Sequence, residues 1–318
     1  MEYISTKEAS LKWDLSEQVV RRFCREGRII GAIQDGTSWL IPEKARKPRR
    51  KDLGDADAHN LPPLAKTLYI QKKKNNYHGF YDYVKVNLTY SSCRMASNRL
   101  TRNNIEMIFK KGKVAPTFEP VKVSDLIEAL NHGVCVDFIL DHILEPISPA
   151  FIRKIHKLHM SGTVDERLRK VEAGVFRTAS YKNQNRQLPP ASLVNSTLES
   201  AIKEYEGLNH PDDVDLLAFH VAFEQIAPFE DGNGRVGRLI LFKECLRHEI
   251  MPFIIDDKKR SMYLEGIQNW DKDKSILYEV MSDTQKRFEA QIRLQELKRH
   301  GESFLPEGYR EEDLRDEF

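Results

Sequence analysis

The chain has 318 residues, of which 31% are charged and 40% hydrophobic, a composition typical of a soluble globular protein. This length is enough for one large domain or for two, with a sizeable buried core. The longest apolar runs, such as Leu239–Phe242, are far shorter than the ~18 residues that a membrane helix needs. The N-terminus lacks the pattern of a secretory signal. We therefore expect a cytoplasmic protein with no membrane partner.

The cysteines are few and widely separated along the chain. They form no C-x-x-C pair and no spacing typical of a metal site or of a disulfide framework. We therefore expect reduced and mostly buried thiols at Cys24, Cys93, Cys135 and Cys245.

The charge is unevenly distributed, although the whole chain sums to only +2. Residues 1–51 contain 12 Lys or Arg against 7 Asp or Glu, a net charge of +5, so the remaining residues sum to −3. A basic end on a slightly acidic body suggests a separate module that meets a polyanion.

The first 45 residues have a pattern of their own. Ser5 or Thr6 can cap a short helix that runs to Trp13, and Ser16 can cap a second helix that ends near Gly27. Two apolar runs then flank the turn sequence Gln-Asp-Gly-Thr at 34–37, which predicts a β-hairpin.

Helix, tight turn, basic second helix and β-wing resemble the winged helix-turn-helix of MerR and excisionase-type DNA-binding proteins. The resemblance rests on TKEASLKWDLSEQVVRRFCREGRI and the later WLIP. It implies that the second helix enters the major groove of DNA, with four side chains near base edges and phosphates: Gln18, Arg21, Arg22 and Arg25. The alternative is a small protein-binding module whose arginines are only a solvated face.

A glycine-rich loop opens a helix in the C-terminal half of the chain. Gly232-Asn233-Gly234 allows positive φ angles and close approach of a ligand to the backbone, and Arg235 and Arg238 follow one turn apart. Backbone N–H groups at a helix N-terminus and two guanidiniums form a site for anions. Asp231 beside them can hold a divalent cation that bridges phosphates. These residues predict a polyphosphate site.

The same segment resembles the Fic (Fido-fold) family motif H-P-F-x-[D/E]-G-N-G-R-x-x-R. The chain reads APFEDGNGRVGR from Ala227 to Arg238 and matches eight of the nine specified positions. Supporting matches cover most of residues 65–290. They include AGVFRT at 173–178, followed by two prolines at 189–190, and PFIIDD at 252–257, followed by Arg260 and Tyr263.

The resemblance implies a mainly α, Fic-type helical core with a β-hairpin flap that docks a target protein by strand pairing. It implies transfer of AMP from ATP, with Mg²⁺ held by Asp231, to a Ser, Thr or Tyr hydroxyl of a target protein or of the chain itself. The implied nucleotide contacts are Asp231, Gly232, Asn233, Gly234, Arg235, Val236, Gly237, Arg238 and Tyr263. The implied flap residues are Gly174, Val175, Phe176, Arg177, Thr178 and Tyr181.

The one mismatch falls on the family's general base, because Ala227 occupies the position of the motif histidine. Alanine cannot accept the proton of the attacking hydroxyl, and general-base help contributes ~10²–10⁴ in rate. His220 lies on the preceding helix and is expected to point into the body. The chain is therefore either a natural pseudoenzyme or carries an engineered His→Ala change, and the intact remainder of the motif favours the second.

A regulatory element of the family is also altered. Many Fic proteins carry an inhibitory helix with the motif [S/T]-x-x-x-E-[G/N], whose glutamate pairs with the second motif arginine. The matching stretch begins at Ser92, which puts Ala96 at the glutamate position. Without that carboxylate, we expect Arg238 to stay free for the γ-phosphate. The alternative is that this segment is merely a packed helix.

These expectations define the domain organisation as a winged helix-turn-helix module at 1–47, a linker at 48–64, a helical region at 65–125, a Fic catalytic domain at 126–290 and a charged tail at 291–318. Two rival functions stay open: a DNA-binding regulator whose body only binds nucleotide, and a phosphotransferase with another donor geometry. The target protein, any DNA sequence and the oligomeric state are also open, and a homo-oligomer is compatible with the sequence.

Overall fold

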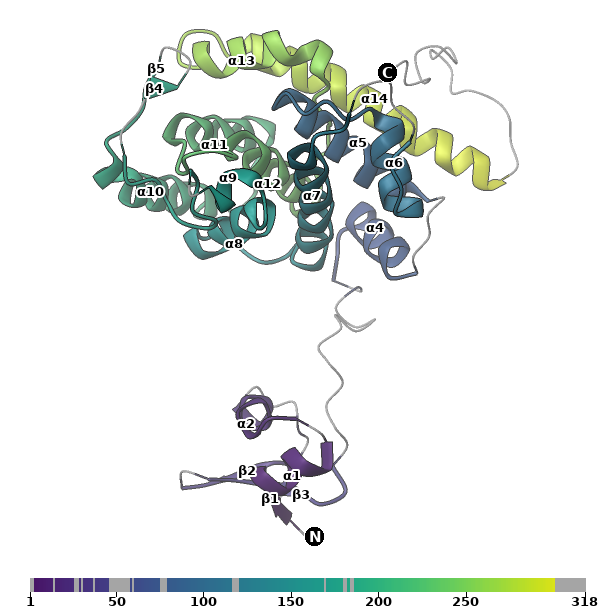
Figure 1. The fold of residues 1–318 in the computed structure, drawn as a ribbon, viewed down its shortest axis with the longest axis vertical. Helices are drawn as coiled ribbons and strands as arrows, with labels where there is room; N and C mark the ends of the chain where they lie inside the picture. Colours follow the sequence, from purple (N-terminus) through teal and green to yellow (C-terminus); the bar gives the residue numbers. More distant parts are fainter. Residues whose placement is uncertain are drawn as a thin grey trace. The chain divides into compact units, whose positions relative to one another are not determined.

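The computed structural model describes residues 3–13, 15–25, 29, 31–36, 38–45, 58, 60–74, 79–115, 120–168, 170–179, 182–183 and 186–300. Most of the expected linker, Tyr181 and residues 301–318 of the expected tail lie outside these ranges. The chain divides into two compact units, residues 1–57 and residues 58–318 (Figure 1). Each unit is considered by itself.

The first unit combines two short helices with a three-stranded antiparallel sheet. Its elements are β1 (Tyr3–Ser5), α1 (Thr6–Trp13), α2 (Glu17–Arg25), β2 (Ile33–Asp35) and β3 (Ser38–Pro42). The sheet order is β1-β3-β2, with Ile4 opposite Ile41 and Gln34 opposite Trp39. The two helices and the hairpin lie where the sequence predicts them. Strand β1 was not predicted, because three residues are too few to show a periodicity.

Local capping and a small core hold this unit together. The Ser5 hydroxyl accepts the backbone N–H of Glu8, and the Glu8 carboxylate accepts the backbone N–H of Ser5, so helix α1 begins with a capping box. Thr6 donates its hydroxyl proton to Glu17 over 2.8 Å, which ties α1 to α2. The apolar side chains that these contacts bring together are Ala9, Trp13, Val20, Phe23, Cys24, Ile29 and Ile41.

The second unit is a helical body with one short hairpin (Figure 1). Its helices are α4 (Pro63–Lys73), α5 (Phe80–Met95), α6 (Arg102–Lys111), α7 (Val123–Asp141), α8 (Pro149–Met160), α9 (Val164–Arg167), α10 (Val194–Glu206), α11 (Asp213–Ile226), α12 (Asn233–Arg247), α13 (Arg260–Asn269) and α14 (Ser275–His300). Strands β4 (Lys182–Asn183) and β5 (Arg186–Gln187) form an antiparallel pair. The expected mainly α body with a β-hairpin is therefore confirmed. None of the described helices is long and apolar enough to cross a bilayer.

Helix α12 lies at the centre of this body. Its residues from Arg235 to Leu246 are all buried, and it packs against α4, α5, α7, α8 and α11. One hydrophobic core runs from Ala65 in α4 to Phe288 in α14. Residues from both the helical region expected at 65–125 and the domain expected at 126–290 belong to this core, and a smaller second core lies between α5, α6 and α7. The N-terminus of α12 points out of that core, which is where the glycine-rich loop lies.

The other end of α12 is held by buried charges that the sequence did not single out. Lys243 and Glu244 are fully buried and paired at 2.6 Å. Glu244 also accepts the hydroxyl proton of Tyr205 and a proton of Arg247, while Arg247 donates to Glu206 over 2.7 Å. Removing one partner of such a network leaves a buried charge without compensation. These contacts join α10 to α12 and fix the position of α12 relative to the body.

Candidate functional site: a cavity at the N-terminus of helix α12

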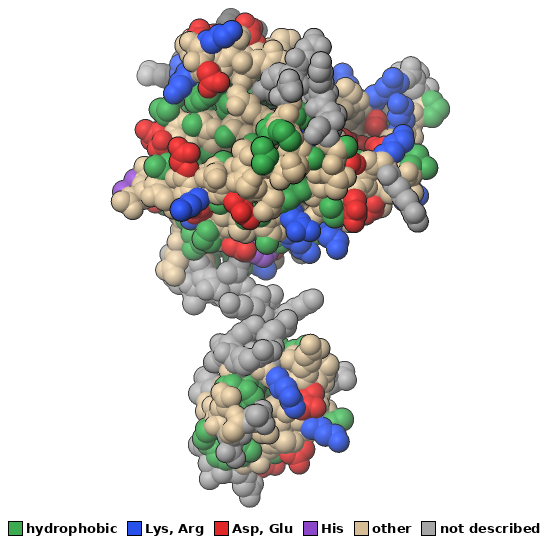
Figure 2. Space-filling model, turned by 90° about the vertical axis from the view of Figure 1, so that its left-hand side faces the viewer, with side chains coloured by type: hydrophobic (Ala, Val, Ile, Leu, Met, Phe, Trp, Pro, Cys, Tyr) green, Lys and Arg blue, Asp and Glu red, His purple; other side chains and the backbone are tan. Residues whose placement is uncertain are grey.

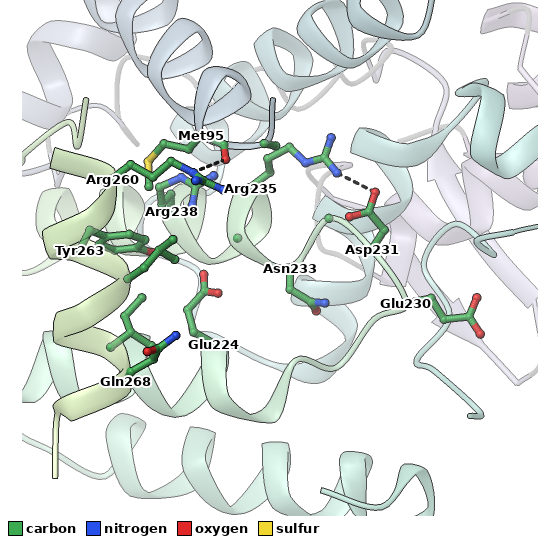
Figure 3. A pocket seen from close by; sticks show the side chains of 15 residues that line it. Met95, Glu224, Glu230, Asp231, Asn233, Arg235, Arg238, Arg260, Tyr263 and Gln268 are labelled. Atoms are coloured by element: carbon green, nitrogen blue, oxygen red, sulfur yellow. Dashed lines mark hydrogen bonds and ion pairs between the residues drawn. The ribbon is translucent and has the colours of Figure 1, made fainter. Parts of the chain in front are cut away.

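A cavity of about 250 Å³ opens where α12 begins. The ends of α5 and α11 and one side of α13 complete its wall (Figure 3). It is lined by Met95, Ala96, Glu224, Glu230, Asp231, Gly232, Asn233, Gly234, Arg235, Arg238, Arg260, Tyr263, Leu264, Ile267 and Gln268. Polar groups gather at the helix N-terminus, and α13 contributes both apolar and polar side chains to the wall.

The loop between α11 and α12 has an unusual backbone at both of its ends. Ala227 ends α11 in the left-handed region, with φ of 43°, and Gly232 precedes α12 with φ of 80°. Asn233 closes the loop on itself, because its side chain accepts the backbone N–H of Phe229 and donates to the Phe229 carbonyl. The tight turn leaves the first peptide groups of α12 at the cavity, and the N-cap residue, Gly232, has no side chain to cap them.

A buried guanidinium supports this loop from beneath. Arg177 is 3% exposed and donates to the carbonyls of Ala227 at 2.9 Å and Ile226 at 3.3 Å, the last carbonyls of α11. It also donates to the carbonyls of Ala179 and Pro189, on either side of the hairpin. One side chain therefore satisfies the C-terminus of α11 and joins it to the segment that carries β4 and β5.

A buried histidine holds the other side of the loop. His156 of α8 stacks on Phe229, with ring centroids 3.7 Å apart and planes at 1°. Its Nδ1 accepts the backbone N–H of Gly174, so Nε2 carries the proton and donates to the carbonyl of Asp231 at 3.1 Å. Burial lowers the pKa of His156 to about 4, against weaker opposition from Asp231. The imidazole is therefore neutral at neutral pH and acts as a structural support.

The acidic residue of the loop is paired with the first motif arginine. Arg235 donates to Asp231 at 2.8 Å and, through its other terminal nitrogen, to Glu128 of α7 at 2.6 Å. Burial acts to raise the pKa of Asp231, but Arg235 and the backbone N–H of Gly232 together outweigh it and hold this pKa below its usual value. Asp231 is thus ionised, and its side chain is 52% exposed at the cavity.

The second motif arginine is held by α5. Arg238 donates through Nε to the Ser92 hydroxyl at 3.1 Å and through Nη2 to the Ser92 carbonyl at 2.9 Å. Only 7% of Arg238 is exposed. The expectation that Arg238 stays free was therefore wrong, because Ser92 takes part of its donors even without a glutamate at position 96. Both partners of Arg238 at Ser92 are neutral oxygens, so the positive charge next to the cavity is not compensated by them.

Most of the predicted nucleotide contacts do meet at one place. Asp231, Gly232, Asn233, Gly234, Arg235, Arg238 and Tyr263 all line the cavity, and Ala96 of the expected regulatory segment joins them. Val236 and Gly237 do not: Val236 is buried in the core, and a side chain at Gly237 would meet the Glu224 carboxylate at 2.7 Å. The structure thus does not bring these two residues to the cavity, since the first turn of a helix exposes only one face to a ligand.

Two further predicted positions lie behind the cavity wall. Ala227 is fully buried and does not line the cavity. His220 is 2% exposed and contacts the Tyr263 hydroxyl at 2.8 Å, so it points into the body as expected and cannot replace the missing base. Burial lowers the pKa of His220 to about 3, which keeps its ring neutral.

The expected flap residues are divided between core and surface. Gly174 and Arg177 are buried under the loop, and Phe176 packs on Phe229 with centroids 5.3 Å apart. Val175 is half-buried and Thr178 is exposed. The paired strands lie further along, at 182–187, so 174–178 is the base of the hairpin and not its edge.

Sequence reasoning missed Glu128, Glu224 and the structural role of His156. Glu128 comes from a helix more than a hundred residues away in sequence, and nothing in its neighbourhood marks it. Glu224 lies one turn before Ala227 on the same side of α11 as the cavity, so helical spacing from the motif was an available signal. Arg260, noted after the motif, donates to the Met95 carbonyl at 3.2 Å and lines the cavity.

The predicted DNA contacts lie on α2 of the first unit. Gln18 and Arg21 are exposed, and Arg21 pairs with Glu17 one turn earlier at 2.9 Å. The side chains of Arg22 and Arg25 lie outside the described part of the structure. On the visible face of the body, in contrast, acidic and basic side chains are interspersed (Figure 2).

The segment that forms the loop before α12 matches a known protein family. Residues 146–244 match the model of the Fic/DOC family. The matched segment contains helices α8 to α11, the β4–β5 hairpin and all of the loop, and it ends within α12. This part of the chain is therefore similar to the Fic/DOC family.

Solved structures show that the fold extends beyond the matched segment. A Fic-domain signalling protein from Bacteroides thetaiotaomicron is similar over 80% of this chain and 96% of its own, with a TM-score of 0.59 and 18% identity. A fragment of Fic-1 from C. elegans matches over 79% and 75%, with a TM-score of 0.54 and 18% identity. A Fic family protein from Desulfovibrio desulfuricans matches over 77% and 86%, with a TM-score of 0.51 and 19% identity. The body has the Fic-type helical fold.

The support that His156 gives to the loop makes stability depend on pH. The pKa of His156 is lower in the folded chain, about 4, than its usual value of 6.5, so the unfolded chain takes up the proton first. Its contribution is present above pH 6.5 and is lost as pH falls toward 4. We expect the free energy of unfolding to lose about 2 kcal/mol through this residue between about pH 7 and pH 5. His156→Gln keeps one donor and one acceptor, and urea unfolding of this variant should show a correspondingly smaller loss of unfolding free energy between these pH values than the parent. The control variant His210→Gln, at an exposed position, should lose as much as the parent.

Proposed function

We propose that the body transfers AMP from ATP to a hydroxyl group of a protein, either a target or the chain itself. The observation that carries this proposal is the loop APFEDGNGRVGR, which presents the N-terminus of α12 and Arg238 to one cavity and lies in the segment that matches the Fic/DOC family. Proteins of that family transfer nucleotide monophosphates to proteins. The rival reading, a body that only binds nucleotide, shares the cavity and differs in the chemistry at position 227.

The proposed donor site fits a nucleotide with its phosphates at the helix N-terminus. Uncapped peptide N–H groups and a positive helix end favour negative charge, and Arg238 adds a guanidinium. In the described part of the chain, no group of three or more His, Cys, Asp or Glu could hold a metal alone. A single ionised carboxylate such as Asp231 is what a magnesium ion bound to phosphates requires, and the ion would offset phosphate charge.

In the proposed reaction, the hydroxyl oxygen forms a bond to the α-phosphorus, and the bond from that phosphorus to the bridging oxygen of the β-phosphate breaks. Pyrophosphate leaves, and the hydroxyl proton must go to a base. The resemblance assigns the base to position 227, where Ala227 has none to offer. His156 and His220 are already engaged in hydrogen bonds and cannot approach the cavity. We therefore propose that this chain binds ATP and transfers AMP very slowly.

Restoring the base tests this proposal directly. Ala227→His should raise protein labelling from α-³²P-ATP by at least about 10², because general-base help is returned at the attacking hydroxyl. Ala227→Asn is the matched control, since asparagine also tolerates positive φ but takes no proton at neutral pH. Equal labelling by both variants would contradict the assigned role of position 227. Label from γ-³²P-ATP in place of α-³²P-ATP would show phosphotransfer instead.

We further propose that the α5 terminus regulates the site. Ser92 already contacts Arg238, and Ala96 is exposed at the cavity one turn later. In the Ala227→His background, Ala96→Glu should place a carboxylate that competes with the phosphates for Arg238. We expect ATP affinity, measured by calorimetry, to fall about tenfold. Ala96→Gln has nearly the same size without the charge and should leave affinity unchanged; a loss shared by both variants would indicate steric obstruction only.

A second proposed activity belongs to the first unit, where two helices pack beside a small sheet and α2 exposes Gln18 and Arg21. This arrangement and the +5 charge of residues 1–51 favour duplex DNA as a partner.

We expect the full chain to retard duplex DNA from the promoter region of its own gene in a gel shift, with affinity that falls steeply as salt rises. Arg21→Ala combined with Arg22→Ala and Arg25→Ala should abolish the shift and leave ATP binding intact. Lys7→Ala, an exposed basic residue on α1, is the control and should retain most of the affinity. A shift that survives the triple change would exclude α2 as the DNA reader.

A further inference from the structure

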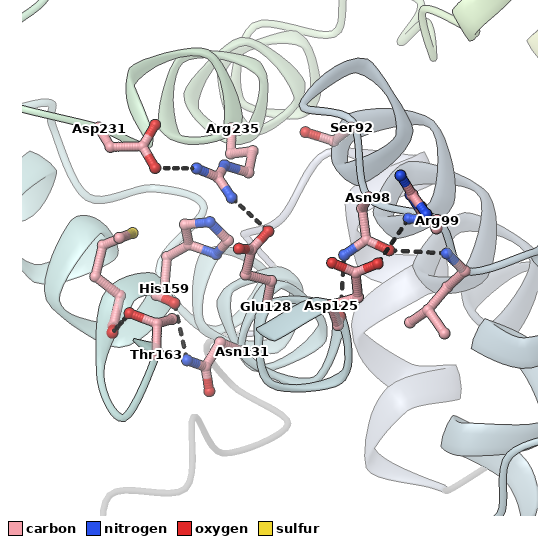
Figure 4. Close-up of polar contacts among 12 residues, drawn as sticks. Ser92, Asn98, Arg99, Asp125, Glu128, Asn131, His159, Thr163, Asp231 and Arg235 are labelled. Carbon is pink, nitrogen blue, oxygen red and sulfur yellow. Dashed lines mark hydrogen bonds and ion pairs between the residues drawn. The ribbon is translucent and has the colours of Figure 1, made fainter. Parts of the chain in front are cut away.

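Arg235 lies between two carboxylates that reach it from different elements (Figure 4). Asp231 comes from the loop before α12 and accepts from Nη2 at 2.8 Å, and Glu128 comes from the middle of α7 and accepts from Nη1 at 2.6 Å. The side chain of Arg235 is only 5% exposed and that of Glu128 16%, whereas that of Asp231 is 52% exposed. The three groups form a chain that begins in the helical core and ends at the cavity.

The charges of Glu128, Arg235 and Asp231 do not cancel. One guanidinium, which stays protonated at any physiological pH, faces two carboxylates, so the cluster carries a net negative charge when both are ionised. Burial raises the pKa of Glu128, although Arg235 opposes this. His159 lies close by, but burial first and Arg235 second hold its pKa well below the usual value, so it adds no positive charge. Asp231, the more exposed of the two carboxylates, lies at the open end of the cluster.

Geometry limits what Arg235 can do for a phosphate. Its two terminal nitrogens are directed to Asp231 and Glu128, and in Figure 3 its guanidinium is turned toward Asp231 and away from the middle of the cavity. Arg238, in contrast, donates to neutral oxygens of Ser92 on α5. The two motif arginines therefore have different surroundings, and Arg235 is the one whose position depends on α7.

We propose that Glu128 is a positioning residue for the cation site: by holding Arg235, it fixes the orientation of Asp231 and leaves that carboxylate enough negative charge to bind the magnesium ion of a nucleotide. This inference rests on the proposed function and extends it to a residue outside the loop. If Glu128 loses its charge, Arg235 is left with Asp231 alone and neutralises it. Cation binding then weakens, while the electrostatic repulsion between the cluster and the phosphates decreases.

The test compares ATP affinity in excess EDTA with ATP affinity in Mg²⁺, measured by calorimetry on the full chain. In the parent, Mg²⁺ should strengthen ATP binding. In Glu128→Gln, which keeps the shape and removes the charge, this gain should shrink about tenfold, the size typical of changes to groups that support metal ligands. Affinity in EDTA should stay equal or increase. A purely structural role of Glu128 would instead lower both affinities together, and that result would overturn the inference.

Two further variants keep the result interpretable. Asp137→Asn removes another α7 carboxylate, which pairs with Lys85 at 2.6 Å, and it should leave the Mg²⁺ gain unchanged. Asp231→Asn should abolish the gain in ATP affinity from Mg²⁺. Adding Glu128→Gln to it should lower the affinity no further, because Glu128 acts through Arg235 on Asp231. An undiminished gain in Glu128→Gln overturns this inference alone. Absence of any gain in the parent overturns the cation role of Asp231 as well.

Discussion

The buried guanidinium of Arg177 is the contact on which the rest of the site depends. Helix α11 ends with carbonyls that have no partner within the helix, and the chain reverses immediately afterwards at Ala227. Arg177 supplies donors to Ile226 and Ala227, while its own backbone N–H donates to the carbonyl of Pro228 at 2.9 Å. Charge-assisted bonds in a buried setting are among the stronger ones, so this end of α11 is fixed without water. The turn that follows can then be tight.

Beyond the tight turn, the two motif arginines contact different partners. Both lie on α12, three residues apart, so the sequence alone predicts that they bind the same phosphate groups together. In the fold, Arg235 faces α7 and is compensated by two carboxylates, whereas Arg238 faces α5 and meets neutral oxygens. Residues three apart on a helix differ by about 60° in direction, which is enough to meet different neighbouring helices. The carboxylates that contact Arg235 therefore offset its charge, whereas Arg238 and Arg260 of α13 bring further guanidiniums to the cavity.

The sequence alone predicts the local features of the site but not its long-range contacts. Loop composition and spacing were sufficient to predict the glycine turn, the helix that begins after it and several cavity residues next to it, because these depend on local backbone rules. The roles of Glu128, Ser92 and Arg177 were not predictable, because each is set by a helix or segment far away in sequence. Val236 and Gly237 show a different limit: a motif names consecutive residues, but a helix turns some of them toward the core.

The backbone conformation at position 227 bears on which side chains fit there. A left-handed conformation costs an ordinary L-residue roughly 1–2 kcal/mol, and histidine is among the residues enriched in it, unlike alanine. The structure nevertheless keeps Ala227 at φ of 43°. The reason is that Arg177, Asn233 and the stack of His156 on Phe229 determine this turn through backbone and neighbouring groups. None of these contacts involves the side chain at 227. The architecture of the cavity is therefore independent of the side chain at 227, so the proposed binding and the proposed chemistry can be tested separately at this position.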